Sequence, residues 1–157
     1  MTQAEFAERI VAMQGALYRV STTLLRQMCD REDAVQTSIE KAWRAQHKLR
    51  DDNALRAWVV RILVRECYAL TKKRKRELPM EQLPEREVAP DAAPELNRVL
   101  DALPEKYRLP VTLHYIEGYA VWEIAHILSR PQGTIKSQLS RGRGMLQDAL
   151  RREEADV

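Results

Sequence analysis

The sequence has little of the chemistry on which metalloenzymes, secreted proteins and membrane proteins depend. Its 157 residues include two cysteines, three histidines, five glycines and one phenylalanine. Cys29 and Cys67 lie far apart and form no CxxC pattern, so neither a disulfide framework nor a zinc site is indicated. No leader-like apolar segment opens the chain, and no apolar run approaches the ~20 residues that span a bilayer. We therefore expect a cytoplasmic protein with no cofactor, no bound metal and no membrane insertion.

Charge is distributed unevenly along a chain whose total charge is only +3. Residues 1–76 carry a net charge of +7, residues 77–94 a net charge of −4, and residues 95–157 balance at zero. A basic region of this kind favours a polyanionic partner such as nucleic acid. A solvated helical surface gives the same charge run, so charge alone does not decide between the two.

Four of the seven prolines gather in ELPMEQLPEREVAPDAAP, residues 77–94. Proline removes a backbone donor and fixes φ, so neither a long helix nor a central strand is expected there. We predict a flexible linker at 77–94 between one domain at 1–76 and another at 95–157. In polyproline form its eighteen residues would extend about 56 Å, which is the axial length of roughly 16 base pairs.

Both flanks of the linker show helical periodicity, and no period-2 strand of any length is visible, so we predict an all-α fold of two small helical domains. Phe6, Ile10 and Met13 begin an apolar stripe at spacings of three and four residues. A second helix is predicted to start after Asp30, which would be its N-cap. Trp43 falls on the inner stripe of that helix and is expected in the core. A third helix is predicted from about residue 53.

GTIKSQLSRGRGML, residues 133–146, has a helical rhythm although it contains three glycines. On a helical wheel Ile135, Leu139 and Gly142 share one face, and the opposite face is short, polar and cationic. The preceding VWEIAHIL and the short turn SRPQ complete a helix–turn–helix pattern. Such a polar face suits the DNA major groove, where Arg and Lys bond guanine and hydroxyls bond base edges. A solvated helix on a small bundle is the alternative.

Two segments, in this order, resemble the extracytoplasmic-function class of bacterial RNA polymerase sigma factors. DREDAVQTSIEKAWRAQHKLRDDNALRAWVVRILVRECYALTKKRKR is similar to region 2, which binds core polymerase and opens the −10 promoter element. LDALPEKYRLPVTLHYIEGYAVWEIAHILSRPQGTIKSQLSRGRGML is similar to region 4, which reads the −35 element. The resemblance implies a sigma factor that confers promoter recognition and assists DNA melting in transcription initiation. It also implies three partners, namely the polymerase core, promoter DNA and an anti-sigma factor, which in this family is often a membrane protein.

The resemblance assigns site residues to three surfaces. For the −35 element the base-contacting positions are the ones that the wheel selects, Lys136, Ser137, Ser140 and Arg141, and the phosphate-contacting positions are Thr134, Gln138 and Arg143. For the −10 element a loop that receives a flipped base comprises Asn53, Ala54 and Leu55, a specificity position is Arg65, and the phosphate-holding cations are Arg56, Arg61, Lys72, Lys73 and Arg74. For the polymerase core the contacts are Asp33, Gln36, Thr37, Glu40 and Arg44.

The sequence departs from the family pattern at three positions of region 4. Ser129 stands where the family commonly has glycine, Gln138 where it has arginine or lysine, and Gly142 where it has alanine. Loss of a cation at 138 is expected to remove a phosphate contact, which lowers affinity and salt dependence without changing the bases that are read.

Two other functions fit part of the pattern. A stand-alone helix–turn–helix regulator would bind duplex DNA without polymerase and would need a dimer interface. A pure adaptor would bind another protein through residues 35–43 and never touch DNA. An enzyme is disfavoured, because no Ser/His/Asp, paired-carboxylate, metal or phosphate-loop constellation is present.

Overall fold

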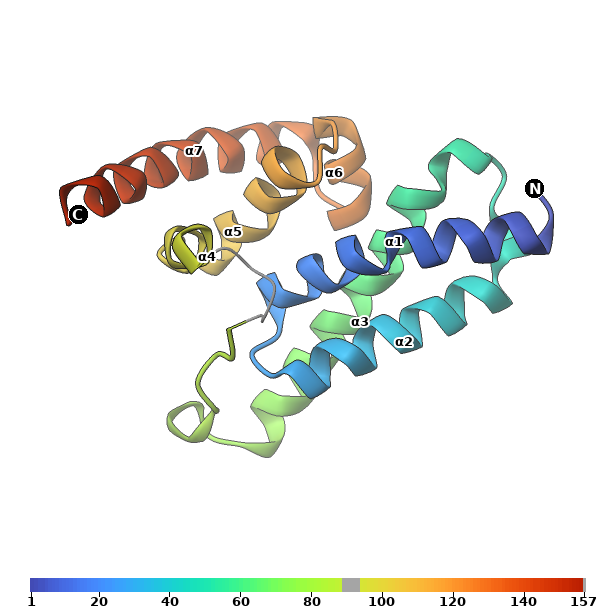
Figure 1. The fold of residues 1–157 in the computed structure, drawn as a ribbon, viewed down its shortest axis with the longest axis horizontal. Coiled ribbons are helices and arrows are strands. Elements are labelled where there is room, and N and C mark those ends of the chain that lie inside the picture. Colours follow the sequence, from blue (N-terminus) through green and yellow to red (C-terminus); the bar gives the residue numbers. More distant parts are fainter. Residues whose placement is uncertain (89–93, 157) are drawn as a thin grey trace. The chain divides into compact units, whose positions relative to one another are not determined.

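The computed structural model describes residues 1–88 and 94–156, and every regular element in them is helical (Figure 1). The predicted all-α class is confirmed for this part of the chain. The chain divides into two compact units, residues 1–87 and 88–157. Residues 89–93 of the predicted linker lie outside the described residues. None of the helices described is long and apolar enough to cross a bilayer.

The first unit is built from three long helices, α1 (Gln3–Leu24), α2 (Met28–Arg44) and α3 (Leu55–Glu77). Each packs against the other two (Figure 1). At the start of α1, the Thr2 hydroxyl accepts a bond from the Glu5 amide and the Glu5 carboxylate accepts one from the Thr2 amide, a capping box. The predicted apolar stripe of α1 is buried along its whole length, and its members are Phe6, Ile10, Met13, Leu17, Val20 and Leu24.

Two details of α2 differ from the sequence prediction. The helix begins at Met28 with Gln27 as N-cap, so the prediction that Asp30 caps it is wrong. Asp30 is instead buried in the first turn, where its carboxylate accepts bonds of 2.7 Å and 3.2 Å from the guanidinium of Arg74. The placement of Trp43 in the core is also wrong. Trp43 is 42% exposed, and its ring forms a T-shaped pair with the ring of Phe6, with 5.8 Å between the centroids.

After α3 the chain turns back toward the C-terminal end of α1 and contacts it through residues 84–87, the return segment. Arg31 is fully buried there, and its guanidinium donates to the carbonyls of Leu25 at 3.0 Å and Glu87 at 2.6 Å. The Glu87 amide donates to the Arg26 carbonyl at 2.7 Å, and Arg86 donates to the Thr22 carbonyl. Because a buried charge is costly without hydrogen-bonding partners, the return segment helps to stabilise a cation at the negative end of α1.

The second unit contains α4 (Pro94–Asp101), α5 (Glu105–Val111), the π-helical segment η4 (Thr112–Ile116), α6 (Val121–Leu128) and α7 (Gln132–Ala155). The first, second and fourth of these pack on α7 (Figure 1). Pro110 lies inside α5, and the wider π turn follows directly, as is common where a helix loses a regular backbone bond. The Glu123 carboxylate accepts a bond of 3.0 Å from the Ala120 amide and caps α6.

The turn between α6 and α7 and the packing of α7 both depend on special backbone positions. Ser129 adopts a left-handed conformation, with φ 53° and ψ 48°, where the family commonly has glycine. Gly142 faces α5 so closely that a Cβ atom there would lie 2.5 Å from Cγ2 of Val111. A Cβ at Gly144 would have no neighbour within 4 Å. Glycine at 142 therefore permits the close contact of α5 with α7, whereas the glycine at 144 has no such packing role.

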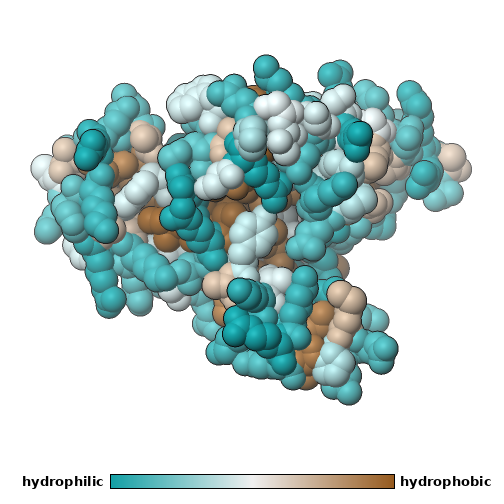
Figure 2. All heavy atoms as spheres, turned by 180° about the vertical axis from the view of Figure 1, so that it is seen from behind, coloured by the Kyte–Doolittle hydropathy of each residue, from teal (hydrophilic) through white to brown (hydrophobic). Residues whose placement is uncertain are grey.

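Figure 2 shows the hydropathy of one face of the molecule. Hydrophilic residues predominate on the face drawn in Figure 2, as expected for a chain in which 31% of the residues are charged. The apolar stripes are therefore used mainly inside each unit, and the candidate sites are built from polar side chains on the outside of the helices.

Candidate nucleic-acid interface

The first half of α7 presents the polar face that the helical wheel predicted. Ile135, Leu139 and Gly142 are buried against the rest of the second unit. The four positions that match the family's base contacts are all exposed, and we call them the α7 outer face: Lys136, Ser137, Ser140 and Arg141. No acidic residue occurs between 133 and 147, so this surface is cationic over about four helical turns. The predicted division of α7 into a buried and an exposed face is confirmed.

Residues flanking this face are held by neighbouring elements. Thr134 and Arg143 are exposed, whereas Gln138 is half-buried and its side-chain oxygen accepts a bond of 3.3 Å from Arg130. Arg130 belongs to the turn between α6 and α7. A guanidinium therefore lies beside the position where the family commonly carries a cation, although residue 138 itself is neutral.

Arg141 also has a partner that the sequence pattern did not reveal. Tyr107 of α5 is only 5% exposed, and hydrogen bonds from Arg141 and then from Lys106 lower the pKa of its hydroxyl. The Lys106 ammonium lies 4.9 Å from the centroid of the same ring. This arrangement brings Lys106, a cation of α5, to the edge of the α7 outer face. No periodicity of α7 could indicate it, because the residues that supply it belong to α5.

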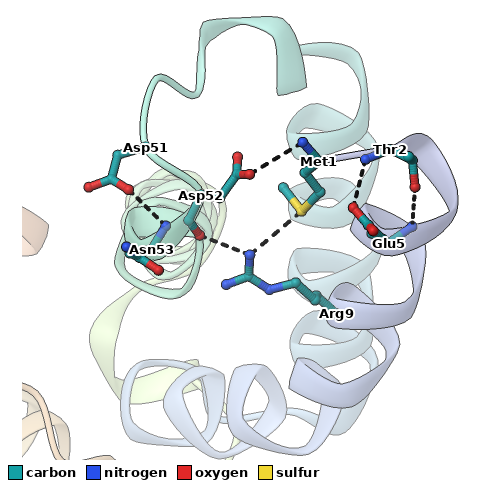
Figure 3. A network of polar contacts seen from close by, with 7 residues as sticks. All are labelled: Met1, Thr2, Glu5, Arg9, Asp51, Asp52 and Asn53. Atoms are coloured by element: carbon teal, nitrogen blue, oxygen red, sulfur yellow. Dashed lines mark hydrogen bonds and ion pairs between the residues drawn. The ribbon is translucent and has the colours of Figure 1, made fainter.

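In the first unit, the 45–54 loop connects α2 to α3 through two short turns, η1 (Gln46–Lys48) and η2 (Asp52–Ala54). A carboxylate oxygen of Asp51 accepts a bond of 3.0 Å from the Asn53 amide and caps the second turn (Figure 3). Asn53 and Ala54 are exposed, as a loop that receives a base requires. Leu55 is fully buried as the first residue of α3, so its side chain anchors the loop and is not available to DNA.

The start of α1 contacts this loop from the side (Figure 3). Nη1 of Arg9 donates to the main-chain carbonyl of Asp52 at 2.9 Å and also contacts the Met1 sulfur at 3.6 Å. The amino group of Met1 lies 3.3 Å from the Asp52 carboxylate. Sequence reasoning missed Arg9, because its partner lies 43 positions away and no local pattern links the two.

The predicted −10 contacts on α3, which are the specificity position Arg65 and the phosphate-holding cations, differ in their exposure. Arg56, Arg65, Lys72 and Lys73 are exposed. Arg61 is half-buried, and burial together with the charge of Arg65 lowers its pKa. Arg74 differs from these residues, because its guanidinium is paired with the buried Asp30 and also contacts Glu77 at 3.4 Å.

On α2, the predicted polymerase contacts lie opposite the buried stripe. That stripe includes Ala34, Val35, Ser38 and Ala42. Four of the predicted contacts are exposed and Thr37 is half-buried, and we call the whole set the α2 outer face: Asp33, Gln36, Thr37, Glu40 and Arg44. The set mixes acidic, amide and basic groups, a composition suited to a polar protein interface.

Comparison with known proteins matches both units to regions of the same protein family. The family model "Sigma-70 region 2" matches residues 10–77, and "Sigma-70, region 4" matches residues 94–146. The chain is 27% identical over 158 residues to the RNA polymerase sigma factor SigV of Bacillus subtilis, covering 98% of this chain and 95% of that protein. It is 28% identical over 159 residues to the RNA polymerase sigma-E factor of Streptomyces coelicolor, covering 98% and 90%.

Solved structures give the same match. The chain is similar, with a TM-score of 0.83 and 28% identity, to the sigma factor RpoE from Bartonella quintana, which was solved in complex with the anti-sigma factor NepR. The match covers 94% of this chain and 97% of that one. A likeness of fold alone, at 22% identity and a TM-score of 0.71, relates it to CnrH in complex with the cytosolic domain of CnrY.

Proposed function

The chain belongs to the sigma-70 family and is an RNA polymerase sigma factor, and we propose that it divides promoter recognition between its two units. The 88–157 unit reads the −35 element through the α7 outer face. The 1–87 unit binds core polymerase through the α2 outer face and receives an unstacked −10 base at the 45–54 loop. The sigma factor acts in the cytoplasm and catalyses no bond chemistry itself, which the polymerase core supplies.

The observation that carries the proposal is the face of α7. Its apolar side is fixed on α5 by the close approach at Gly142, and four exposed donors lie on the other side with no acid among them. Such a helix can enter the major groove and bond base edges. The half-buried Gln138 receives a bond from Arg130, and we assign to Arg130 the phosphate contact that position 138 cannot make.

Two residues of the sequence-predicted −10 set are better explained by packing. Leu55 is fully buried, and Arg74 is bound to the buried carboxylate of Asp30. Removal of Arg74 would leave that carboxylate unpaired, a change that costs ~3–5 kcal/mol when the pair is buried and less here because Arg74 is 41% exposed. We therefore keep Asn53 and Ala54 as the base-receiving positions and the exposed cations of α3 as phosphate contacts.

The deciding experiment is run-off transcription with purified core polymerase on a library of random promoters. We expect holoenzyme formation and selection of paired −35 and −10 sequences. A chain that forms no holoenzyme, or that footprints a palindromic duplex without core polymerase, would act as a stand-alone regulator instead. Gln36→Ala on the α2 outer face is expected to weaken core binding, whereas the same change at the exposed Gln14 of α1 serves as control.

An inhibitory partner is part of the same proposal. The relative with a TM-score of 0.83 was solved with an anti-sigma factor bound. We propose that this chain is likewise held inactive by an anti-sigma factor until a signal releases it. Co-purification of the full chain with proteins of its own source, followed by competition with core polymerase, would test this. A partner that binds without blocking holoenzyme formation would contradict it.

A further inference from the structure

The 45–54 loop is shaped mainly by contacts within itself. Lys48 donates from its amide to the Ala45 carbonyl at 2.9 Å, and Ala54 donates to the Asp51 carbonyl at the same distance. The Asp51 side chain adds a cap to the second turn. Bonds between residues two or three positions apart set the curvature of a loop, but they do not fix its position against the rest of the domain.

A bond from outside the loop does fix that position, and it comes from α1 (Figure 3). Arg9 donates to the carbonyl of Asp52, directly before Asn53. The acceptor is main chain, so this bond holds the backbone whatever side chain stands at position 52. The contact between the Met1 amino group and the Asp52 carboxylate is a separate interaction with the side chain of the same residue.

The element that carries Arg9 is itself rigidly held. Phe6 is 1% exposed and Ile10 is 4% exposed, so the turn of α1 that bears Arg9 is anchored in the core of its unit on both sides. The capping box of Thr2 and Glu5 fixes the turn before it. A loop bonded to such an element is already ordered before DNA binds. Binding then loses less conformational entropy.

We propose that Arg9 is a positioning residue for −10 recognition. By holding the main chain at Asp52, it keeps Asn53 and Ala54 in the arrangement that receives the flipped base, without touching DNA itself. The proposal rests on the function proposed above, in which this loop captures an unstacked base. Unstacking has to be compensated by protein contacts, so a loop that must first become ordered captures the base less well.

The test uses holoenzyme assembled from the full chain and a promoter carrying 2-aminopurine at the flipped −10 position, whose fluorescence rises when the base leaves the stack. Arg9→Met removes the donors and keeps most of the side-chain volume. Arg19→Met removes the same charge from an exposed position of α1 ten residues further on and is the control. We expect Arg9→Met to lower the equilibrium constant for base capture about 3–10-fold, the factor lost with one hydrogen bond of ordinary strength, and Arg19→Met to leave it unchanged.

Three further measurements separate positioning from other roles. Amide hydrogen exchange within residues 51–54 should become faster in Arg9→Met without DNA, and discrimination among bases at the flipped position should fall. Affinity for core polymerase and the slope of binding against salt should stay as in the wild type. A lowered salt slope with intact base discrimination would make Arg9 a phosphate contact and overturn the proposal, as would unchanged fluorescence and exchange.

The result for the wild-type chain separates this inference from the proposed function. If wild-type holoenzyme forms but gives no fluorescence rise at any −10 position, the loop does not capture a base and both proposals fail. If the wild type gives the rise and Arg9→Met gives the same one, only the role of Arg9 is refuted. Asp52→Asn retains the main-chain carbonyl that accepts from Arg9, so this variant is expected to keep base discrimination. If Asp52→Asn loses base discrimination, the Asp52 carboxylate positions the loop, and Arg9 does not.

Discussion

Alanine substituted at Gly142 and at Gly144 should have different effects on stability, although the two positions lie two residues apart in α7. Alanine is favoured over glycine in a helix interior by ~0.8–1.0 kcal/mol, and this gain applies to both. At Gly144 a new methyl group meets nothing within 4 Å, so Gly144→Ala should stabilise the 88–157 unit by about that amount.

At Gly142 the same methyl group collides with α5. Its Cβ would lie 2.5 Å from Cγ2 of Val111 and 3.4 Å from Cβ of Tyr107. Valine has one strongly preferred χ1 rotamer in a helix, so this methyl cannot turn away freely. Overpacking of a close-packed contact costs ~1–3 kcal/mol. After the propensity gain, Gly142→Ala should range from nearly neutral to ~2 kcal/mol destabilising, and should lie ~1–3 kcal/mol below Gly144→Ala.

Native-state hydrogen exchange of the amides in α5 and α7 measures these differences in the full chain, because it reports the opening of each unit separately. Adding Val111→Ala to Gly142→Ala removes the colliding methyl, so the pair should lose less stability than the sum of the two single changes. If Gly142→Ala and Gly144→Ala stabilise the unit equally, the contact of α5 with α7 tolerates a methyl group, and close approach is not the reason for glycine at 142.

Three further predictions concern single groups. Arg141→Ala should lose ~1–3 kcal/mol of binding free energy at one −35 base pair, measured by competition among base-substituted promoters with holoenzyme. Arg151→Ala, further along the exposed side of α7, should lose none. Equal promoter selection by the two variants would remove Arg141 from the recognition set. Burial raises the pKa of Cys67 to about 12. A thiol reagent at pH 8 should therefore modify the exposed Cys29 within minutes and leave Cys67 unmodified in the folded chain. Rapid modification of both cysteines would contradict the packing of α3. The hydrogen bond from Arg98 of α4 lowers the pKa of Glu153, so this pair stabilises the docking of α4 at pH values above the ordinary pKa of 4.5 and loses that contribution as the pH falls through the lowered pKa. Protection of the α4 amides, measured relative to their intrinsic exchange rates at each pH, should fall there in the wild type but show no such pH step in Glu153→Gln.

Much of the fold follows from local periodicity. The apolar stripe of α1 begins at Phe6, and α7 has a buried side with Ile135 and an exposed side with Lys136. Each pattern lies within a single helix, so spacings of three and four residues determine it. The choice of glycine at 142 is also visible in the sequence as an apolar-face position. Its reason, the methyl group of Val111 on another helix, requires the structure.

Contacts between distant segments could not be predicted in this way. Asp30 resembles an N-cap by its position in the sequence, but its carboxylate is used by Arg74, 44 residues later. Trp43 lies on the inner stripe, yet it sits near the end of α2 and is 42% exposed, although its ring pairs with that of Phe6. Periodicity states which side of a helix is covered. It does not state which residue covers it, and for that reason the bond from Arg9 to the 45–54 loop was also missed.

The bonds of the return segment have a consequence for promoter spacing. Residues 77–94 would extend about 56 Å in polyproline form, whereas the seven residues 88–94, which follow the segment bonded to the end of α1, would extend about 22 Å in the same form. Residues 77–87 therefore add no reach between the two units while Arg31 is bonded to the Glu87 carbonyl. We therefore expect that two units bound to one promoter would bridge a longer spacer only after these bonds open. On this expectation, the spacing between the two promoter elements that the chain accepts would depend on the strength of bonds inside the first unit as well as on chain length.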